Sequence, residues 1–235
     1  MDNKASNLAV IFDMDGVLTD TTALHCRSWC EAAARRGWRF EPTDYEAMRG
    51  LAREESLRVF FEVVGRHMEG AERAGLAEPL LRQAVIEEKQ RLFLEYTDAL
   101  NAADRLDGVT ALVDGLRARG APLAVGSSSR NAELVLRRIG LRDAFAVVVD
   151  GNEVPISKPA PAIFLECARR LGAAAERCVV IEDAASGVEA ARAARMKCVG
   201  VGPADRLAGA TLIVSSLALL SVDSLFALVD SPRGT

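Results

Sequence analysis

The sequence predicts an α/β fold, with a parallel sheet as its core and a helical segment inserted after the first strand. Short apolar runs rich in β-branched residues recur along the chain and alternate with helical patterns, which is typical of parallel βαβ units. Between Thr21 and Thr97, however, helical patterns follow one another without a convincing strand. The chain has 235 residues, 50% of them hydrophobic, and this is enough apolar material to bury a sizeable core.

Six apolar runs are expected to form the strands of the sheet, and four helical patterns accompany them. The expected strands are Leu8–Phe12, Pro122–Gly126, Phe145–Val149, Cys178–Ile181, Cys198–Val201 and Leu212–Val214. The expected helices are Val109–Arg119, Ala132–Ile139, Ala160–Leu171 and Gly187–Arg195. Ligands of parallel sheets bind at the carboxyl ends of the strands, so the loops that follow these runs are the place to search for a site.

The helical segment divides the chain into two expected domains. A helix is predicted from Thr22 to Arg36, and Gly37 is suited to end it. We therefore expect a Rossmann-like α/β core made of residues 1–20 and 98–235, and an inserted α-helical cap domain made of residues 21–97. Two short hinges, near residues 18–21 and 97–103, would join them.

Composition and charge exclude several classes of protein. The net charge is −4 and the charges are interspersed, so there is no basic stripe to bind nucleic acid. The start, Met1–Asn7, is polar and the next apolar run is too short for a membrane helix, so no membrane association is expected. Five cysteines without a CxxC pair fit a reducing compartment, and we expect a cytoplasmic protein. His25, Cys26 and Cys30 lack a second ligand pair and are interpreted as ordinary helix residues rather than a zinc site.

Two acidic residues, Asp13 and Asp15, directly follow the first expected strand. If the extended geometry persists, both side chains project to the same side. Gly16 allows the backbone to turn away and leaves room for a ligand. Paired acids at such a position also occur as simple turn caps, whereas an EF-hand calcium loop is excluded because Gly16 lies at the wrong place in that pattern.

Three further polar segments follow expected strands, namely Ser127–Ser129, Lys158 and Glu182–Asp183. Each alone fits a turn or a helix cap, but together they bring carboxylates, hydroxyls and a lysine to one edge of the sheet. Carboxylate and carbonyl oxygens suit Mg²⁺, and a lysine with a hydroxyl can stabilise a phosphoryl group in transfer. An ionised aspartate can attack phosphorus, and a neighbouring carboxylate can serve as general acid and base. The pattern therefore favours phosphoryl transfer.

In this order, the motifs Asp13-Met-Asp-Gly-Val17, Ser127, Lys158-Pro159 and Glu182-Asp183 resemble the four motifs of the haloacid dehalogenase-like superfamily, and the resemblance covers nearly the whole chain. It implies that Asp13 is the nucleophile and Asp15 the general acid and base.

The same resemblance implies one Mg²⁺ per active site. Asp13, Asp183 and the backbone carbonyl of Asp15 would bind it, and Glu182 would support the site. Ser127 and Lys158 would hold the phosphate that is transferred.

Finer features are similar to the β-phosphoglucomutase branch of the superfamily. The segment Asp13–His25, with Trp29 soon after, is similar to the opening of these enzymes, and Arg49–Leu57 resembles the substrate loop of their cap. This likeness implies that Arg53 grips the distal phosphate, aided by Ser129 and Asn131.

By the same likeness, further cap residues have roles. Those implied to position Asp15 as the cap closes are Thr21, His25 and Lys89, and those implied to line the cap side of the sugar site are Ser56 and Trp29. Taken one at a time, His25 and Trp29 are more typical of helix packing, and Arg53 of a surface charge. The chain departs from the branch at Leu51-Ala52 and at Val149–Glu153, and neither departure removes a catalytic group.

We therefore expect a phosphotransferase that forms an aspartyl phosphate and interconverts β-glucose 1-phosphate and glucose 6-phosphate, with a hexose bisphosphate as activating intermediate. A sugar-phosphate phosphatase that transfers the phosphoryl group to water is the close alternative. A non-catalytic metal- or phosphate-binding module is the third, and the intact acids of the motifs disfavour it. The expected partner is a small phosphorylated sugar, and the chain is expected to be a monomer.

Overall fold

The computed structural model describes residues 8–48, 51, 53–154 and 156–230. Their contacts divide the chain into two compact units, Met1–Asp20 with Asn101–Thr235, and Thr21–Leu100. We call the first the core unit and the second the cap unit. The limits that the sequence predicts for the insertion, residues 21–97, remain a proposal.

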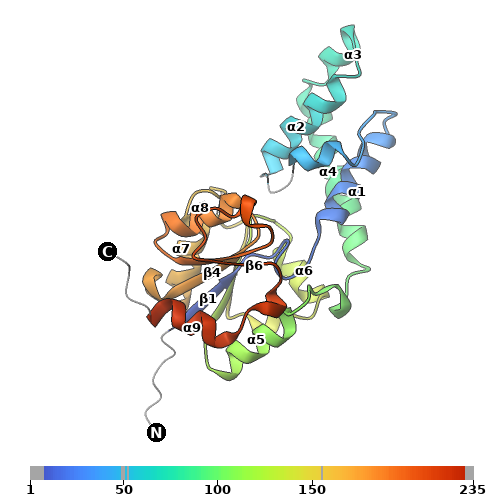
Figure 1. Ribbon diagram of the computed structural model, residues 1–235. Helices are drawn as coiled ribbons and strands as arrows, with labels where there is room; N and C mark the ends of the chain where they lie inside the picture. The colour runs from blue at the N-terminus through green and yellow to red at the C-terminus, as the bar shows by residue number, and fades with distance from the viewer. Residues whose placement is uncertain (1–7, 49–50, 52, 155, 231–235) are drawn as a thin grey trace. The chain divides into compact units, whose positions relative to one another are not determined.

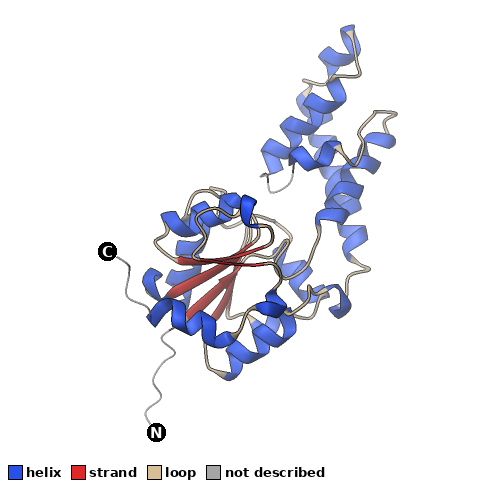
Figure 2. Cartoon of the chain, viewed as in Figure 1, coloured by secondary structure: helices blue, strands red, loops and turns tan. Residues whose placement is uncertain are grey.

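The core unit is built on a six-stranded sheet in which every neighbouring pair is parallel (Figure 2). The strands lie in the order β3-β2-β1-β4-β5-β6. Their bounds are β1 Ala9–Phe12, β2 Leu123–Gly126, β3 Val147–Val149, β4 Cys178–Glu182, β5 Lys197–Val201 and β6 Leu212–Val214. The strands β1, β2 and β4 are buried at every position, which explains why their sequences are continuous apolar runs rather than alternating ones. This sheet confirms the predicted α/β class.

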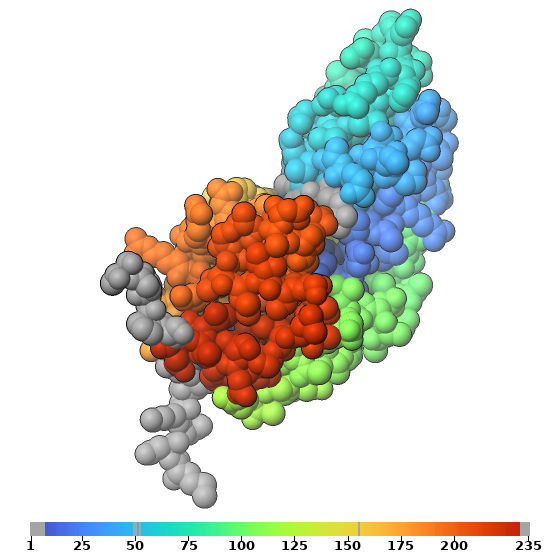
Figure 3. Space-filling model, viewed as in Figure 1, coloured from blue at the N-terminus to red at the C-terminus, as the bar shows by residue number. Residues whose placement is uncertain are grey.

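Helices cover both faces of the sheet, with α7 and α8 on one face and α5 and α9 on the other (Figure 1). The core helices are α5 Val109–Ala118, α6 Ala132–Arg138, α7 Ala162–Leu171, α8 Ala185–Ala193 and α9 Val222–Asp230. The C-terminal part of the chain, coloured orange to red, forms a continuous surface of this unit (Figure 3). In the cluster between sheet and helices, Phe164 of α7 and Val188 of α8 pack with Ile11 of β1.

The cap unit is helical and has an apolar core of its own. Its helices are α1 Thr22–Ala34, α2 Arg53–Gly65, α3 Gly70–Gly75 and α4 Pro79–Thr97. Phe60 is fully buried at the centre of an aromatic cluster, with its ring 4.7 Å from Trp29 and 6.4 Å from Trp38. No described helix of either unit is both long and apolar enough to cross a membrane.

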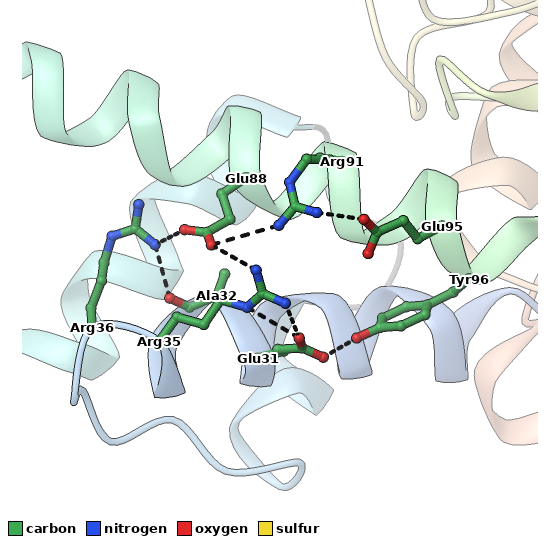
Figure 4. Close-up of polar contacts among 8 residues, drawn as sticks. All are labelled: Glu31, Ala32, Arg35, Arg36, Glu88, Arg91, Glu95 and Tyr96. Carbon is green, nitrogen blue, oxygen red and sulfur yellow. Dashed lines mark hydrogen bonds and ion pairs between the residues drawn. The ribbon is translucent and has the colours of Figure 1, made fainter.

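A network of charged side chains ties α1 to α4 on the polar side of the cap (Figure 4). Arg35 and Arg36, which directly follow α1, both pair with Glu88 of α4. Glu31 of α1 pairs with Arg35 and accepts a hydrogen bond from the Tyr96 hydroxyl of α4. Single exposed pairs contribute little to stability, but here several pairs share partners and fix how the two helices lie side by side.

The sequence located the six strands, α1 and the core helices α5 to α8, but not all of their ends. The helix expected from Ala160 begins at Ala162, because Pro159 and Pro161 precede it and Pro161 occupies the N-cap. The helix expected from Gly187 begins two residues earlier, at Ala185. The sequence analysis did not predict α9, a short amphipathic helix in which only Leu225 is fully buried.

Candidate active site

The parallel register of β1 brings the ends of three strands together at one edge of the sheet. β1 lies between β2 and β4, and Phe12, its last residue, pairs with Val125 on one side and Ile181 on the other. The next residue, Asp13, continues this arrangement, since its N–H donates to the Ile181 carbonyl at 2.9 Å. Ser127, which directly follows β2, and Glu182, the last residue of β4, are therefore placed beside Asp13 by the sheet itself.

Asp13, Lys158 and Glu182 form a chain of charged contacts at this edge. The Lys158 Nζ lies 2.5 Å from Asp13 Oδ1 and 2.7 Å from Glu182 Oε1. The side chain of Lys158 is 7% exposed and that of Glu182 is 2% exposed, so these ion pairs are almost completely shielded from water. Lys158 also lies over the Phe164 ring, 4.8 Å from its centroid, which supports the ammonium from the apolar side.

Burial and the neighbouring charges shift the pKa values of Asp13 and Lys158. Burial raises the pKa of Asp13 well above its ordinary value; Lys158 acts in the opposite direction, and the carboxylates of Glu182, Asp15 and Asp183 raise it further. Burial disfavours the charged form of Lys158, but Asp13 and Glu182 outweigh it and raise the pKa of the ammonium. Lys158 therefore carries a full positive charge at neutral pH.

The loop after Asp13 turns sharply and makes room for a second acid. Gly16 has a φ of +82°, and its N–H donates to the Thr19 carbonyl at 2.8 Å. A Cβ on Gly16 would lie 2.0 Å from Asp183 Oδ2, so the Asp183 carboxylate occupies the space that a side chain would fill. Glycine is needed here both for the left-handed backbone and for this close approach.

A second glycine, Gly187 of α8, does the same for Glu182. A Cβ at this position would lie 1.7 Å from Glu182 Oε1. The other oxygen of Glu182 accepts the Ala184 N–H at 2.8 Å, so the carboxylate is clamped between the start of α8 and Lys158. The sequence analysis missed this function of Gly187. A glycine five residues after an acid at a strand end is the only signal that could have indicated it.

Three carboxylates at this edge are arranged as a cation site. Asp13, Glu182 and Asp183 each offer one oxygen, and these oxygens lie within 4.8 Å of one another. All are hard oxygen donors, which is the ligand type that Mg²⁺ prefers. Both Glu182 oxygens are already engaged by Lys158 and Ala184, so Asp13 and Asp183 are the better direct ligands. The residues thus fit a bound Mg²⁺, with Glu182 in support.

The loop from Ser127 to Asn131 presents hydroxyl groups next to Asp13. Ser127 is buried, and its Oγ accepts the Ser129 N–H at 3.1 Å. Ser129 Oγ in turn accepts the Asn131 N–H at 3.2 Å. Because each hydroxyl oxygen accepts from the backbone, its own proton can be donated to an anion. The geometry suits the phosphate-binding role expected for this loop, which remains a proposal.

In the cap unit, Lys89 and His25 are in direct contact. The Lys89 Nζ lies 2.7 Å from His25 Nδ1, and the His25 ring stacks on Phe93 with centroids 4.1 Å apart. Burial lowers the pKa of His25 well below its ordinary value, and the charges of Lys89 and Arg53 lower it further. His25 is therefore neutral at neutral pH, and its Nδ1 accepts a hydrogen bond from the Lys89 ammonium. Trp29 belongs to the same cluster, 5.7 Å from the Lys89 ammonium.

Arg53 opens α2 near this cluster. Its Nη2 donates to Gln90 Oε1 at 2.9 Å, a partner that the sequence analysis did not foresee. Ser56 is buried on the same helix and donates to the Leu51 carbonyl at 3.4 Å. Thr21 is fully buried just before α1, and its carbonyl accepts the His25 N–H at 2.9 Å. Arg49, Gly50 and Ala52 of the expected substrate loop lie outside the described residues.

Comparison with known proteins places these features in a family. The model of the haloacid dehalogenase-like hydrolase family matches residues 8–195. The chain is 34% identical to the β-phosphoglucomutase of Bacillus subtilis, over 92% of this chain and 93% of that one. It is also 34% identical to the fructose-1-phosphate phosphatase YqaB of Escherichia coli, over 82% and 95% of the two chains. A crystal structure of β-phosphoglucomutase from Clostridium difficile is 30% identical and covers 94% of this chain and 96% of its own, with a TM-score of 0.82.

We expect Gly187→Ala to lower the free energy of unfolding by about 2–4 kcal/mol. The added methyl group cannot coexist with the Glu182 carboxylate, and displacing that carboxylate breaks a buried ion pair with Lys158. Urea unfolding measures the change. The matched control is Gly75→Ala, also a helical glycine, where a Cβ would meet nothing within 4 Å. Equal losses in both variants would contradict the explanation.

The neutral state of buried His25 predicts a pH-dependent stability of the cap. An unfolded chain binds a proton on this residue near pH 6.5, whereas the folded cap does not. Below pH 6.5 the unfolded state therefore holds more protons than the folded state. As the pH is lowered through this range, the free energy of unfolding should decrease, by up to about 1.4 kcal/mol per pH unit. The cap contains both tryptophans of the chain, so their fluorescence during urea unfolding reports this transition.

His25→Asn should flatten this dependence between pH 6.5 and 5, because the titrating group is gone. The control is His67→Asn, which replaces the other histidine of the chain at an exposed position and should leave the slope unchanged. The explanation is wrong if both variants keep the wild-type slope.

Proposed function

The chain belongs to the haloacid dehalogenase-like hydrolase family, and we propose that it acts as a β-phosphoglucomutase, interconverting β-glucose 1-phosphate and glucose 6-phosphate through a hexose bisphosphate. Its relatives include β-phosphoglucomutases and sugar-phosphate phosphatases, so the enzyme is a phosphohexomutase or a closely related phosphatase. The substrate is a small phosphorylated sugar. We propose that isomerisation dominates over hydrolysis.

The core acids would carry the chemistry in both reactions. In a mutase, phosphorylated Asp13 first gives its phosphoryl group to a hydroxyl of the sugar monophosphate: Asp15 takes the hydroxyl proton, the sugar oxygen attacks the phosphorus, and the bond from phosphorus to Asp13 breaks. The bisphosphate then turns around, Asp13 attacks the phosphorus of its other phosphate, the bond from that phosphorus to the sugar oxygen breaks, and Asp15 returns the proton to that oxygen. In a phosphatase, water takes the place of the sugar hydroxyl.

Lys158 and the acidic cluster would solve the electrostatic problem of this reaction, in which an anionic nucleophile approaches an anionic phosphate. The ammonium of Lys158 stays protonated because Asp13 and Glu182 raise its pKa, and it can bind a phosphoryl oxygen while it holds Asp13. A Mg²⁺ held by Asp13, Asp183 and the Asp15 carbonyl, with Glu182 in support, would supply further positive charge. Ser127 would donate its hydroxyl proton to the same phosphate.

One observation favours the mutase over the phosphatase. A mutase must hold the phosphate that is not reacting in both orientations of its bisphosphate, whereas a phosphatase that acts on a monophosphate need not. Two cations of the cap unit, Arg53 and Lys89, lie close enough to lower the pKa of His25, and Gln90 fixes the guanidinium of Arg53. A planar guanidinium binds phosphate bidentately, so Arg53 is the proposed grip on the second phosphate.

Incubating the enzyme with Mg²⁺, β-glucose 1-phosphate and a trace of hexose bisphosphate tests the proposal. We expect glucose 6-phosphate to exceed free phosphate as the product. Asp13→Asn should abolish both products, because an amide is a poor nucleophile and a weaker metal ligand. Removing the metal with a chelator should abolish them reversibly. Free phosphate as the main product of the wild type would favour the phosphatase, and an active Asp13→Asn variant would exclude Asp13 as nucleophile.

Arg53→Ala separates the two reactions. Losing a charge-assisted contact should cost on the order of 2–3 kcal/mol, or about a hundredfold in the rate of isomerisation. Hydrolysis of an aryl phosphate needs no grip on a second phosphate and should stay within a few-fold of wild type. Arg58→Ala serves as the control, since Arg58 lies on the same helix, is exposed and pairs with Glu55.

Both activities should be measured on one preparation of each variant. If both fall together in Arg53→Ala, the residue is structural. If neither changes, Arg53 is a surface charge, and the phosphatase becomes the better proposal.

A further inference from the structure

The loop that follows β3, Asp150–Glu153, is where the sequence departs from the β-phosphoglucomutase pattern, and the proposed chemistry gives it no function. This loop packs against the Ser127–Asn131 loop. We infer that Gly151 and Asn152 are positioning residues that orient the Ser127–Asn131 loop for a second phosphate, and that they thereby set the preference for ligands with two phosphates. This inference rests on the proposed function of that loop.

Gly151 and Asn152 hold the carbonyl side of the Ser127–Asn131 loop. The Gly151 N–H donates to the Ser129 carbonyl at 3.3 Å, and Asn152 Nδ2 donates to the Arg130 carbonyl at 2.9 Å. A Cβ on Gly151 would lie 2.4 Å from the Ser128 carbonyl oxygen, so only glycine allows the two loops to approach this closely. Three successive carbonyls are thus directed toward the loop after β3.

The opposite side of the same loop consists of N–H groups and hydroxyls. The Ser129 N–H donates to Ser127 Oγ at 3.1 Å, and the Asn131 N–H donates to Ser129 Oγ at 3.2 Å. The peptide group between Arg130 and Asn131 is therefore fixed at both ends, its carbonyl by Asn152 and its N–H by Ser129. Turning this peptide would move the Ser129 hydroxyl and the Asn131 side chain together. Those are the two groups proposed to help hold the non-reacting phosphate.

The loop after β3 is itself anchored. Asp150 is 8% exposed, and its two carboxylate oxygens accept the Asn152 backbone N–H at 2.8 Å and Asn152 Nδ2 at 3.1 Å. The Asp150 carbonyl accepts the N–H groups of Glu153 and Val154, both at 3.1 Å. Since β3 pairs with β2 as far as Gly126 and Val149, the two loops leave adjacent strands at the same level. The sheet therefore fixes the position of Asp150, Asp150 holds Asn152, and Asn152 holds the Arg130 carbonyl.

Two variants test the inference by different physical means. Gly151→Ala pushes the Ser128 carbonyl away, and Asn152→Asp keeps the size of the side chain while removing the donor to Arg130. The measurement is inhibition of p-nitrophenyl phosphate hydrolysis by glucose 1,6-bisphosphate and, separately, by inorganic phosphate. We expect the inhibition constant for the bisphosphate to rise at least tenfold in Gly151→Ala and about threefold to tenfold in Asn152→Asp. The constant for inorganic phosphate and the kcat of hydrolysis should stay within twofold.

Glu153→Gln is the matched control. Glu153 lies in the same loop but pairs with Arg170 of α7, so its loss should change neither inhibition constant. The inference is overturned if Asn152→Asp behaves like Glu153→Gln, or if both inhibition constants rise together. If Gly151→Ala does not fold, Asn152→Asp decides.

The outcome is independent of whether the enzyme is a mutase. A wild type that hydrolyses but does not isomerise, with a selective rise for the bisphosphate in Asn152→Asp, would refute the proposed function and keep this inference. A wild type that isomerises, with an Asn152→Asp variant indistinguishable from it, would support the proposed function and refute this inference.

Discussion

The structure of the core unit depends on one contact, the buried ion pair between Asp13 and Lys158. A carboxylate this deeply buried costs several kcal/mol unless another group compensates its charge. Lys158 does so from a loop 145 residues further along the chain, but its own burial then requires a second carboxylate, Glu182. Three further carboxylates, those of Glu182, Asp15 and Asp183, act on Asp13 against this one ammonium. This excess of negative charge is the physical reason for expecting a divalent cation, because a cation would offset both the burial and the repulsion that raise the pKa of Asp13.

The acids, and the Ser127–Asn131 loop beside them, can be packed at this density only because three glycines leave space. Asp183 lies where Gly16 would carry a Cβ, Glu182 where Gly187 would, and the Ser128 carbonyl where Gly151 would. In each case the group that fills the space is polar and belongs to the site, not to the apolar core. The backbone at these positions thus acts as part of the binding surface, and a methyl group would displace a functional group rather than a replaceable side chain.

The arrangement of strand ends and the close contacts at these glycines explain what the sequence could and could not predict. The buried runs before Asp13, Ser127 and Glu182 were readable as strands, and the rule that parallel strands end at one edge was enough to place these residues together. The contacts of Asp13 and Glu182 with Lys158 agree with that placement, while the individual catalytic roles stay predictions. Gly187, Gln90 and Asn152 were missed because their importance lies in a single spatial contact with a distant residue, which leaves no periodic pattern. The start of α7 was misplaced because two prolines could each have opened the helix. The helix α9 was missed altogether because its apolar stripe is short.

The cap unit presents the converse electrostatic arrangement. Here cations are close together, since Arg53 and Lys89 both lower the pKa of His25, and that imidazole stays neutral beside them. Lys89 donates to the neutral ring and lies 4.7 Å from the Phe93 centroid, so its charge is supported without being neutralised by either group. Two like charges in a partly buried cluster repel each other, and a phosphate bound between them would relieve that repulsion. The charges of the core unit thus favour a cation and those of the cap unit an anion, which is what the proposed binding of Mg²⁺ and a bisphosphate requires.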